Sequence, residues 1–116
     1  METISISILR ELFRNLIPFR NLYEDTGQDT ILNDGVEYSL WDLERLYEAL
    51  PLLPPRQAEA IELVYVRQMK EKAAAVAMGV SPTNPVCVYA TDGLKNLVKL
   101  IEDGTLTWCR PSFVAA

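Results

Sequence analysis

Residues 70–82, with the sequence KEKAAAVAMGVSP, decide the fold of this chain. A helix-turn-helix needs small residues in its first helix, so that the second helix can cross it closely, and a glycine where the turn takes a left-handed backbone. Apolar side chains on both sides of that glycine then hold the second helix against the first. The small residues, the turn glycine, the apolar pair and the start of the second helix are, in that order, Ala74 and Ala75, Gly79, Met78 and Val80, and Ser81-Pro82. The spacing therefore predicts a helix-turn-helix.

Helices are also predicted on both sides of this motif. Pro54-Pro55 is typical of a helix start, and the helix that follows has one apolar face, made of Ala58, Ile61, Val64 and Tyr65. A short alanine-rich helix is expected over residues 70–78. The last helix is expected from Pro82 to Glu102, with Asp103-Gly104 as its C-terminal cap.

The first half of the chain is predicted to add two helices and a long connection. A helix over residues 5–16 has apolar side chains at helical spacing, and Pro18 is expected to end it. Residues 18–38 are mostly loop, although the segments beside Asn33-Asp34-Gly35 are compatible with a short hairpin. Ser39 then caps a helix. The apolar stripe of that helix is Leu40, Leu43, Leu46, Tyr47 and Leu50, and Trp41 is expected in the core together with Tyr47.

These elements predict an all-α fold, a helix-turn-helix bundle of about five helices that can also hold one short β-hairpin near residues 30–38. Residues 1–50 are expected to form an acidic N-terminal helical segment packed on the rest. Residues 51–104 form the helix-turn-helix unit, and residues 105–116 are a tail that the pattern does not place. The connection 18–38 is too poor in glycine and serine to be a free tether, so we expect one cooperative unit.

The net charge of −5 argues against a general nucleic-acid binder, but the charges are unevenly distributed. Residues 1–50 hold ten acids and four bases, a net charge of −6. Residues 67–99 hold five bases and two acids, a net charge of +3. The one basic stretch of the chain therefore coincides with the predicted helix-turn-helix.

Several functional classes are excluded by composition. The chain has no histidine and two cysteines, which excludes a Cys–His nucleophile and leaves too few ligands for a zinc site. It contains no phosphate loop or dinucleotide fingerprint. We therefore predict no enzyme, no catalytic or metal-binding residues and no cofactor. No apolar run approaches the length of a membrane span, and no signal peptide is apparent, so a cytoplasmic protein without membrane contact is expected.

Residues 53–66, LPPRQAEAIELVYV, resemble the helix that precedes the helix-turn-helix in region 4 of bacterial sigma factors. That family has a Leu-Pro-x-Arg-Gln start and an apolar stripe that ends in Tyr-Val. Residues 78–82 resemble the family's turn, and residues 93–97 resemble the end of its recognition helix. The resemblance covers about residues 51–101, under half of the chain, and extends to small sigma-like proteins of actinobacterial phages through the turn sequence SPTNPV at residues 81–86. It implies contact with promoter or operator DNA, and with RNA polymerase through the flap of the β subunit.

The chain departs from the family at the start of the last helix. It has about one extra residue near residues 83–85, and residues 86–91 include no base, so arginine cannot contact guanine from there. The remaining candidates for base contact are Thr83, Asn84, Val88 and Thr91, and the candidates for phosphate contact are Lys70, Lys72, Lys95 and Lys99. Thr83 and Asn84 fit equally well as the end of a helix cap, and each lysine fits as part of a solvated helix face.

Three functions are compatible with these residues. The first is a small DNA-binding transcription regulator, with the resemblance also pointing to a phage. The second is a protein-interaction module that binds RNA polymerase without reading DNA, which the acidic first half favours because it would repel a duplex unless held away from it. The third is a structural or assembly protein that reuses the fold. The DNA sequence recognised, the choice between activation and repression, and the oligomeric state stay open.

Overall fold

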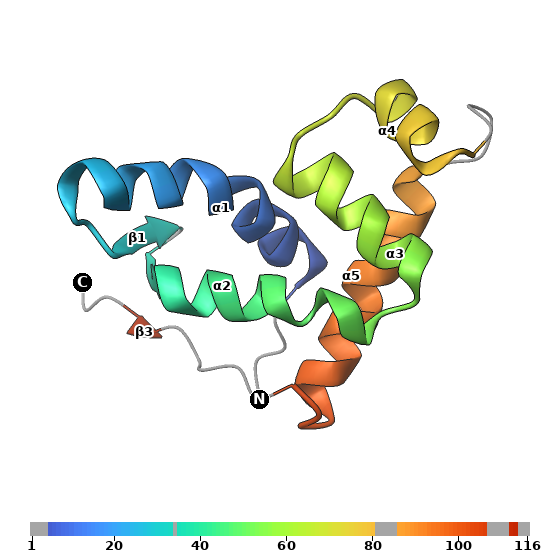
Figure 1. The fold of residues 1–116 in the computed structure, drawn as a ribbon. Coiled ribbons are helices and arrows are strands. Elements are labelled where there is room, and N and C mark those ends of the chain that lie inside the picture. The colour runs from blue at the N-terminus through green and yellow to red at the C-terminus, as the bar shows by residue number, and fades with distance from the viewer. Residues whose placement is uncertain (1–4, 34, 81–85, 107–111, 114–116) are drawn as a thin grey trace.

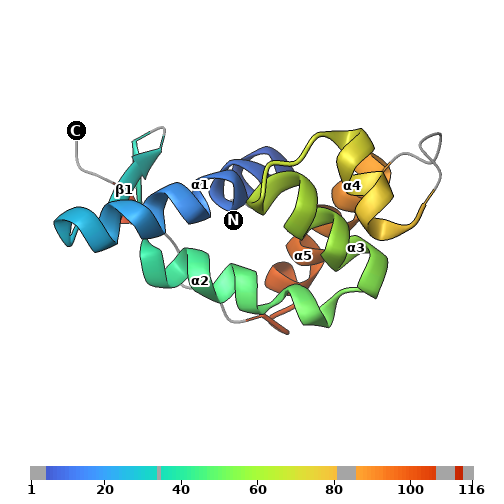
Figure 2. The ribbon, with the colours of Figure 1, turned by 45° about the horizontal axis from the view of Figure 1, so that its top comes forward.

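The computed structural model describes residues 5–33, 35–80, 86–106 and 112–113, and within them it confirms a mainly helical fold with a hairpin. The elements are α1 (Ile6–Thr26), β1 (Thr30–Asn33), β2 (Val36–Ser39), α2 (Leu40–Glu48), the 3₁₀ turn η1 (Leu50–Leu52), α3 (Pro55–Ala60), the π-helix η2 (Ile61–Val66), α4 (Glu71–Met78), α5 (Val86–Glu102) and β3 (Ser112–Phe113). Helices α1 and α2 lie side by side in one half of the molecule, and α3, α4 and α5 form the other half (Figures 1 and 2).

Helix α1 is longer than predicted, because it continues through Pro18 to Thr26. The expectation that Pro18 ends the helix is therefore wrong. A proline within a helix removes the N–H that would reach the carbonyl four residues earlier, here that of Arg14. The side chain of Gln68, from the connection before α4, donates to this carbonyl at 3.1 Å. The buried Phe19 continues the apolar stripe beyond the proline, so packing favours the helix on both sides of it.

The hairpin pairs β1 with β2 in antiparallel register, from Thr30 opposite Ser39 to Asn33 opposite Val36. Part of the unplaced tail adds a third strand, because β3 pairs antiparallel with β2 and Val36 lies opposite Phe113. Residues 112–113 thus lie in the half that holds α1 and α2 (Figure 1).

Ser39 ends β2 and caps α2 in a complete capping box with Asp42, as the sequence predicts. Three leucines of the predicted stripe on α2 are buried, namely Leu40, Leu43 and Leu46, and Leu50 in η1 joins them. Tyr47 is half-buried against this core. Trp41 does not lie in the core as expected, because 67% of its surface is exposed. It occupies the outer side of the first turn of α2, where an i, i+6 spacing to Tyr47 does not place both rings on one face.

Gly79 ends α4 in the left-handed conformation that the motif requires, with φ of 69°. The N–H of Gly79 donates to the carbonyl of Val76 at 3.1 Å, and that of Val80 donates to the carbonyl of Ala75 at 3.0 Å. This is a Schellman arrangement, which satisfies the last carbonyls of α4. The guanidinium of Arg56 in α3 also donates to the carbonyl of Met78, so the turn is bonded to the preceding helix.

Helices α3 and α5 cross closely at Gly93. A Cβ atom at this position would lie 2.7 Å from the Cδ1 of Ile61 and 3.2 Å from the Cβ of Gln57. Near the same crossing, the side-chain amide of Asn96 donates to that of Gln57 at 2.6 Å. The absence of a side chain at Gly93 therefore sets how closely the two helices approach.

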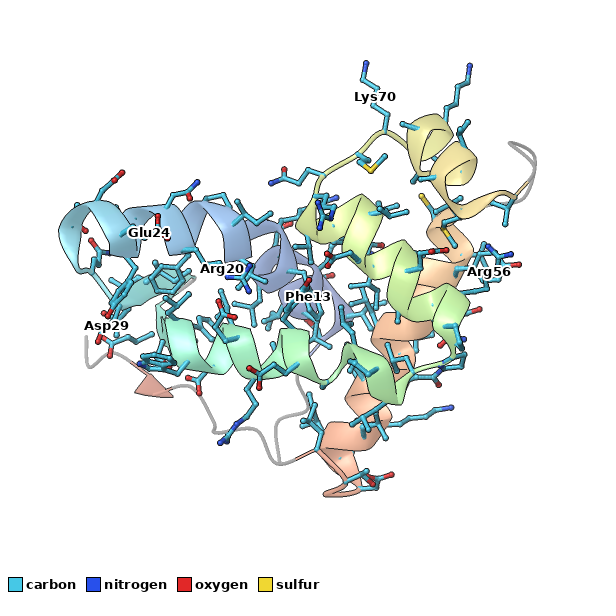
Figure 3. All side chains as sticks on the ribbon, in the orientation of Figure 1. Phe13, Arg20, Glu24, Asp29, Arg56 and Lys70 are labelled. Carbon is cyan, nitrogen blue, oxygen red and sulfur yellow. The ribbon has the colours of Figure 1, made fainter. Side chains whose placement is uncertain are left out.

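One apolar core joins the two halves of the molecule. Helix α1 packs against α2 on one side and against η2 and α5 on the other, and Phe13 lies between the two groups of helices (Figure 3). The α1 residues with at most 1% exposure are Leu9, Leu12, Phe13 and Leu16. These side chains meet Ile61, Leu94 and Leu97 in a single connected cluster.

A polar network crosses the same junction. The Arg20 guanidinium of α1 makes two hydrogen bonds to the Glu44 carboxylate of α2 and lies over the Tyr47 ring. The Tyr47 hydroxyl donates to Glu62 Oε1 of η2 at 2.8 Å, and the same oxygen accepts from Arg67 at 3.2 Å. Burial and the Glu62 carboxylate raise the pKa of Tyr47, and the hydrogen bonds to Glu44 raise the pKa of Arg20. At neutral pH the tyrosine is therefore protonated and the arginine charged, as these bonds require.

Replacing Gly79 with valine is expected to lower stability by about 1 kcal/mol or more, because a β-branched residue is strained at positive φ. No atom lies within 4 Å of the site of a new Cβ, so the loss comes from the backbone and not from a clash. Thermal unfolding of the isolated protein measures it. Gly79→Asn is the control, since asparagine tolerates this conformation, and it should lose less than half as much. Equal melting temperatures for Gly79→Val and the natural protein would contradict the assigned turn.

Gly93→Ala should destabilise the protein in spite of the better helix propensity of alanine, because the added methyl meets Ile61 in a buried, well-packed place. Ile61→Val removes the Cδ1 atom and by itself costs about 0.5–1.5 kcal/mol. In the Ile61→Val background, Gly93→Ala should cost clearly less than it does alone. Denaturant unfolding of the two single variants and the double variant measures this coupling. Strictly additive losses would show that the two groups do not meet.

A fragment that starts at Pro51 should be poorly soluble or molten, because it exposes the apolar surfaces of η2 and α5 that α1 covers. Near-UV circular dichroism and thermal melting of the purified fragment test this. A sharp two-state transition would show that the first 50 residues are an independent appendage.

Candidate nucleic-acid interface

Helix α5 has one side that the core does not use and on which most residues are exposed. Its buried residues, Val86, Ala90, Gly93, Leu94 and Leu97, gather on the side that meets α1 and α3. The opposite side at 3.6 residues per turn is the α5 face, defined here as Val88, Thr91, Asp92, Lys95, Lys99 and Glu102. Val88, with 49% exposure, is the apolar member nearest the turn. Four of the residues predicted to contact DNA therefore lie on the α5 face, namely Val88, Thr91, Lys95 and Lys99. Thr91 is half-buried at the edge of this face.

The α5 face has no net charge. Lys95 and Lys99 are balanced by Asp92 and Glu102, and the composition of the face includes no arginine. Hydroxyl, methyl and carboxylate groups near the turn can bind base edges, because a carboxylate accepts from the cytosine amino group and an apolar side chain contacts the thymine methyl. Asp92 would, however, repel a phosphate. Sequence reasoning did not include Asp92 among the candidates, although its helical spacing from Val88 and Lys95 places it on their side.

The four predicted phosphate-binding lysines do not form one cluster. Lys70 immediately precedes α4 and Lys72 lies in its first turn, and both are exposed. The Lys70 side chain points away from the bundle (Figure 3). Lys99 lies in the last turn of α5, at the opposite end of this half of the molecule (Figure 1). Thr83 and Asn84, the other predicted base contacts, lie outside the described residues.

Two bases that sequence reasoning missed lie beside this half of the molecule. The guanidinium carbons of Arg10 and Arg14, in α1, lie 5.5 Å and 5.6 Å from the centre of the Tyr65 ring of η2. In the sequence both arginines belong to the first half, whose net charge is negative. Only the packing of α1 against η2 shows that their side chains lie against the half that holds the helix-turn-helix. The one signal in the sequence is their i, i+4 spacing, which puts both side chains on the same face of a helix.

Two acids of the first half lie at the other end of the molecule. Glu24 and Asp29 lie at the far end of α1 and in the following connection, remote from Lys70 (Figure 3). The fold thus keeps these two negative charges away from the helix-turn-helix, whereas Glu11 lies beside Arg14 on the same helix. Charges at the far end would repel a duplex at the helix-turn-helix less than charges beside it, because salt screens them over that distance.

Cys87 lies beside the α5 face and is exposed as a residue. Partial burial of its thiol, followed by the charge and hydrogen bonding of the Glu71 carboxylate, raises its pKa, while Arg10 lowers it. The thiol is therefore protonated at neutral pH and is not an activated nucleophile.

The described residues include no group of three acids, cysteines or histidines that could hold a metal ion. Across the same residues, no helix has the length and apolar character of a membrane span.

Two helices joined by a tight glycine turn, the second with an uncovered side, define a helix-turn-helix module. Residues 43–84 match the family model of sigma-70, region 4. The chain therefore holds a sigma region 4-like helix-turn-helix, of which the first helix and the turn lie within the match. Sigma-70 region 4 is a DNA-binding helix-turn-helix class. No curated protein and no solved structure matches the chain.

The matched segment differs in extent from the resemblance expected over residues 51–101. It begins earlier, within α2, and it ends at Asn84, before α5. The helices that support the turn are therefore family-like, and the helix that would enter the DNA groove lies beyond the match. This agrees with the unusual composition of the α5 face.

Proposed function

We propose that the protein is a small transcription regulator that binds promoter or operator DNA with α4, the turn and α5. The observation that carries the proposal is the α5 face, which follows the turn of a sigma region 4-like segment and has four of its six residues exposed. A recognition helix in a helix-turn-helix occupies this position and enters the major groove. The phage origin that the turn sequence implies belongs to the same proposal.

The residues have distinct roles in this proposal. Lys70 and Lys72 contact phosphates on one side of the groove, and Lys95 and Lys99 contact phosphates along α5. Thr83, Asn84, Val88 and Thr91 approach the base edges. Because the α5 face lacks arginine, its base contacts contribute less discrimination than the bidentate guanine contacts common in this class.

A second function is favoured by one specific observation. The neutral α5 face, beyond the end of the family match, fits a protein surface as well as a groove, so the module can bind RNA polymerase without reading DNA. Val88 gives the end of this face nearest the turn an apolar contact, and the two acids and two lysines beyond it can pair with opposite charges on a partner.

The double variant Lys95→Ala with Lys99→Ala separates the two functions. It removes two long-range charges and little buried area, so it should weaken DNA binding and spare a protein interface. Fluorescence anisotropy with labelled duplex over a salt series should show a log–log slope about 2 shallower than that of the natural protein. Pull-down of purified RNA polymerase with the same variant should be unchanged.

Lys70→Ala with Lys72→Ala is the matched comparison at the other end of the module and should lower the slope by a similar amount. Thermal melting confirms that each variant is folded. Unchanged DNA binding in both double variants would exclude the DNA-binding proposal and leave the polymerase-binding one.

A further inference from the structure

We propose that Arg10 and Arg14 of α1 form a phosphate-binding extension of the helix-turn-helix, on the backbone of the duplex that the α5 face meets. This inference rests on the proposed DNA-binding function. Helix α1 lies outside the matched residues 43–84, so the extension is a feature of this chain and not of the family segment.

The first argument is the position of the two side chains. Both guanidinium groups lie over the same ring, that of the buried Tyr65 in η2. A guanidinium stacked on a ring has lost much of its freedom before any ligand arrives, so less entropy is lost on binding. The planar fork of a guanidinium suits a phosphate, because two parallel N–H groups can donate to two of its oxygens.

The second argument is charge. Two like charges at i and i+4 repel each other on a helix, and here the ring holds them in place. Glu11 pairs with Arg14 at 3.0 Å, but among the described residues no acid lies within ion-pair distance of Arg10. A phosphate between the two guanidinium groups would relieve the repulsion, which a neutral partner would not do.

The third argument is the neighbourhood. The connection between η2 and α4 contains Arg67 and precedes Lys70. It lies beside α1, because the side chain of Gln68 in this connection donates a hydrogen bond to the carbonyl of Arg14. The charge of Arg10 acts on Cys87 in the first turn of α5. Helix α1 packs against α5, so Arg10 lies near the end of α5 that follows the turn. One strand of a duplex in contact with the α5 face would pass there in this proposal.

Acidic groups are present in the same neighbourhood and limit its charge. Glu62 pairs with Arg67, Glu11 pairs with Arg14, and Glu71 lies beside Cys87. Against them stand five bases, Arg10, Arg14, Arg67, Lys70 and Lys72, so the patch has a net charge of +2 on a chain of −5. Of these acids, Glu11 is the one whose removal frees a proposed contact.

The slope of binding against salt is the first test. Each phosphate contact contributes about 0.9 to the log–log slope, so the four lysines alone give about −3.6 and the two arginines take it to about −5.4. The probe is a fluorescein-labelled duplex of mixed sequence, with anisotropy measured between about 50 and 200 mM salt. Arg10→Gln with Arg14→Gln should shift the slope by about 2, and Arg10→Lys with Arg14→Lys, which keeps both charges, should restore most of it.

A gain of affinity provides a second test that a folding defect cannot imitate. Glu11→Gln removes the carboxylate that pairs with Arg14, so binding should tighten by about threefold or more at low salt. Glu24→Gln is the matched control, the same change on the same helix. It lies 13 residues further on, roughly 20 Å along the axis, where screening leaves less than about a twofold effect.

The outcomes are distinct. Failure of the natural protein to bind the duplex would overturn the proposed function and this inference together. Binding that depends on Lys95 and Lys99 but is unaffected by the arginine and Glu11 variants would overturn this inference alone. A shallower slope without the arginines, or tighter binding for Glu11→Gln than for Glu24→Gln, supports it. Should the double glutamine variant melt early, the exposed Arg14→Gln alone and the Glu11 and Glu24 pair still decide the question.

Discussion

The burial of one side of α1 against η2 and α5 is the constraint on which the rest of the structure depends. Leu9, Leu12, Phe13 and Leu16 have almost no exposed surface, and each such side chain contributes roughly 1.5–3 kcal/mol when fully buried. This contact holds the sigma-like half against the first half, and it brings together the groups of the polar network from Arg20 to Arg67. It also places Arg10 and Arg14 beside the half that holds the helix-turn-helix. The end of α1 that carries Glu24 lies away from that half (Figure 3).

Features specified by neighbours in the chain could be predicted from the sequence. The turn at Gly79, the capping box at Ser39 and the hairpin after α1 depend on residues at most nine positions apart, and all three are confirmed. The passage of α1 through Pro18 could not be predicted, because the group that bonds the freed carbonyl of Arg14 is Gln68, 54 positions later. The third strand likewise depends on a partner far away in the chain, since β3 pairs with β2.

The candidate site divides in the same way. Periodicity alone places Val88, Thr91, Lys95 and Lys99 on one side of α5, and the structure has them there. The position of Arg10 and Arg14, in contrast, could not be predicted from the net charge of each segment. A net charge does not indicate which end of a helix packs against which neighbour. Trp41 shows the same limit for apolar residues, because a large ring near a buried stripe can lie just off it and stay exposed.

The exposure of most of the α5 face has a consequence for how the sequence of such a protein can diverge. The exposed residues of this face, Val88, Lys95, Lys99 and Glu102, contribute little to the core, which lies on the other side of the helix, and exposed positions of this kind usually tolerate substitution within about 0.5 kcal/mol. The glycine at the α3 crossing and the leucines beneath would stay as they are. Mutation can therefore change the charge and shape of this surface without the loss of folding that changes in the core entail, and divergent copies of this scaffold can present different surfaces over one unaltered interior.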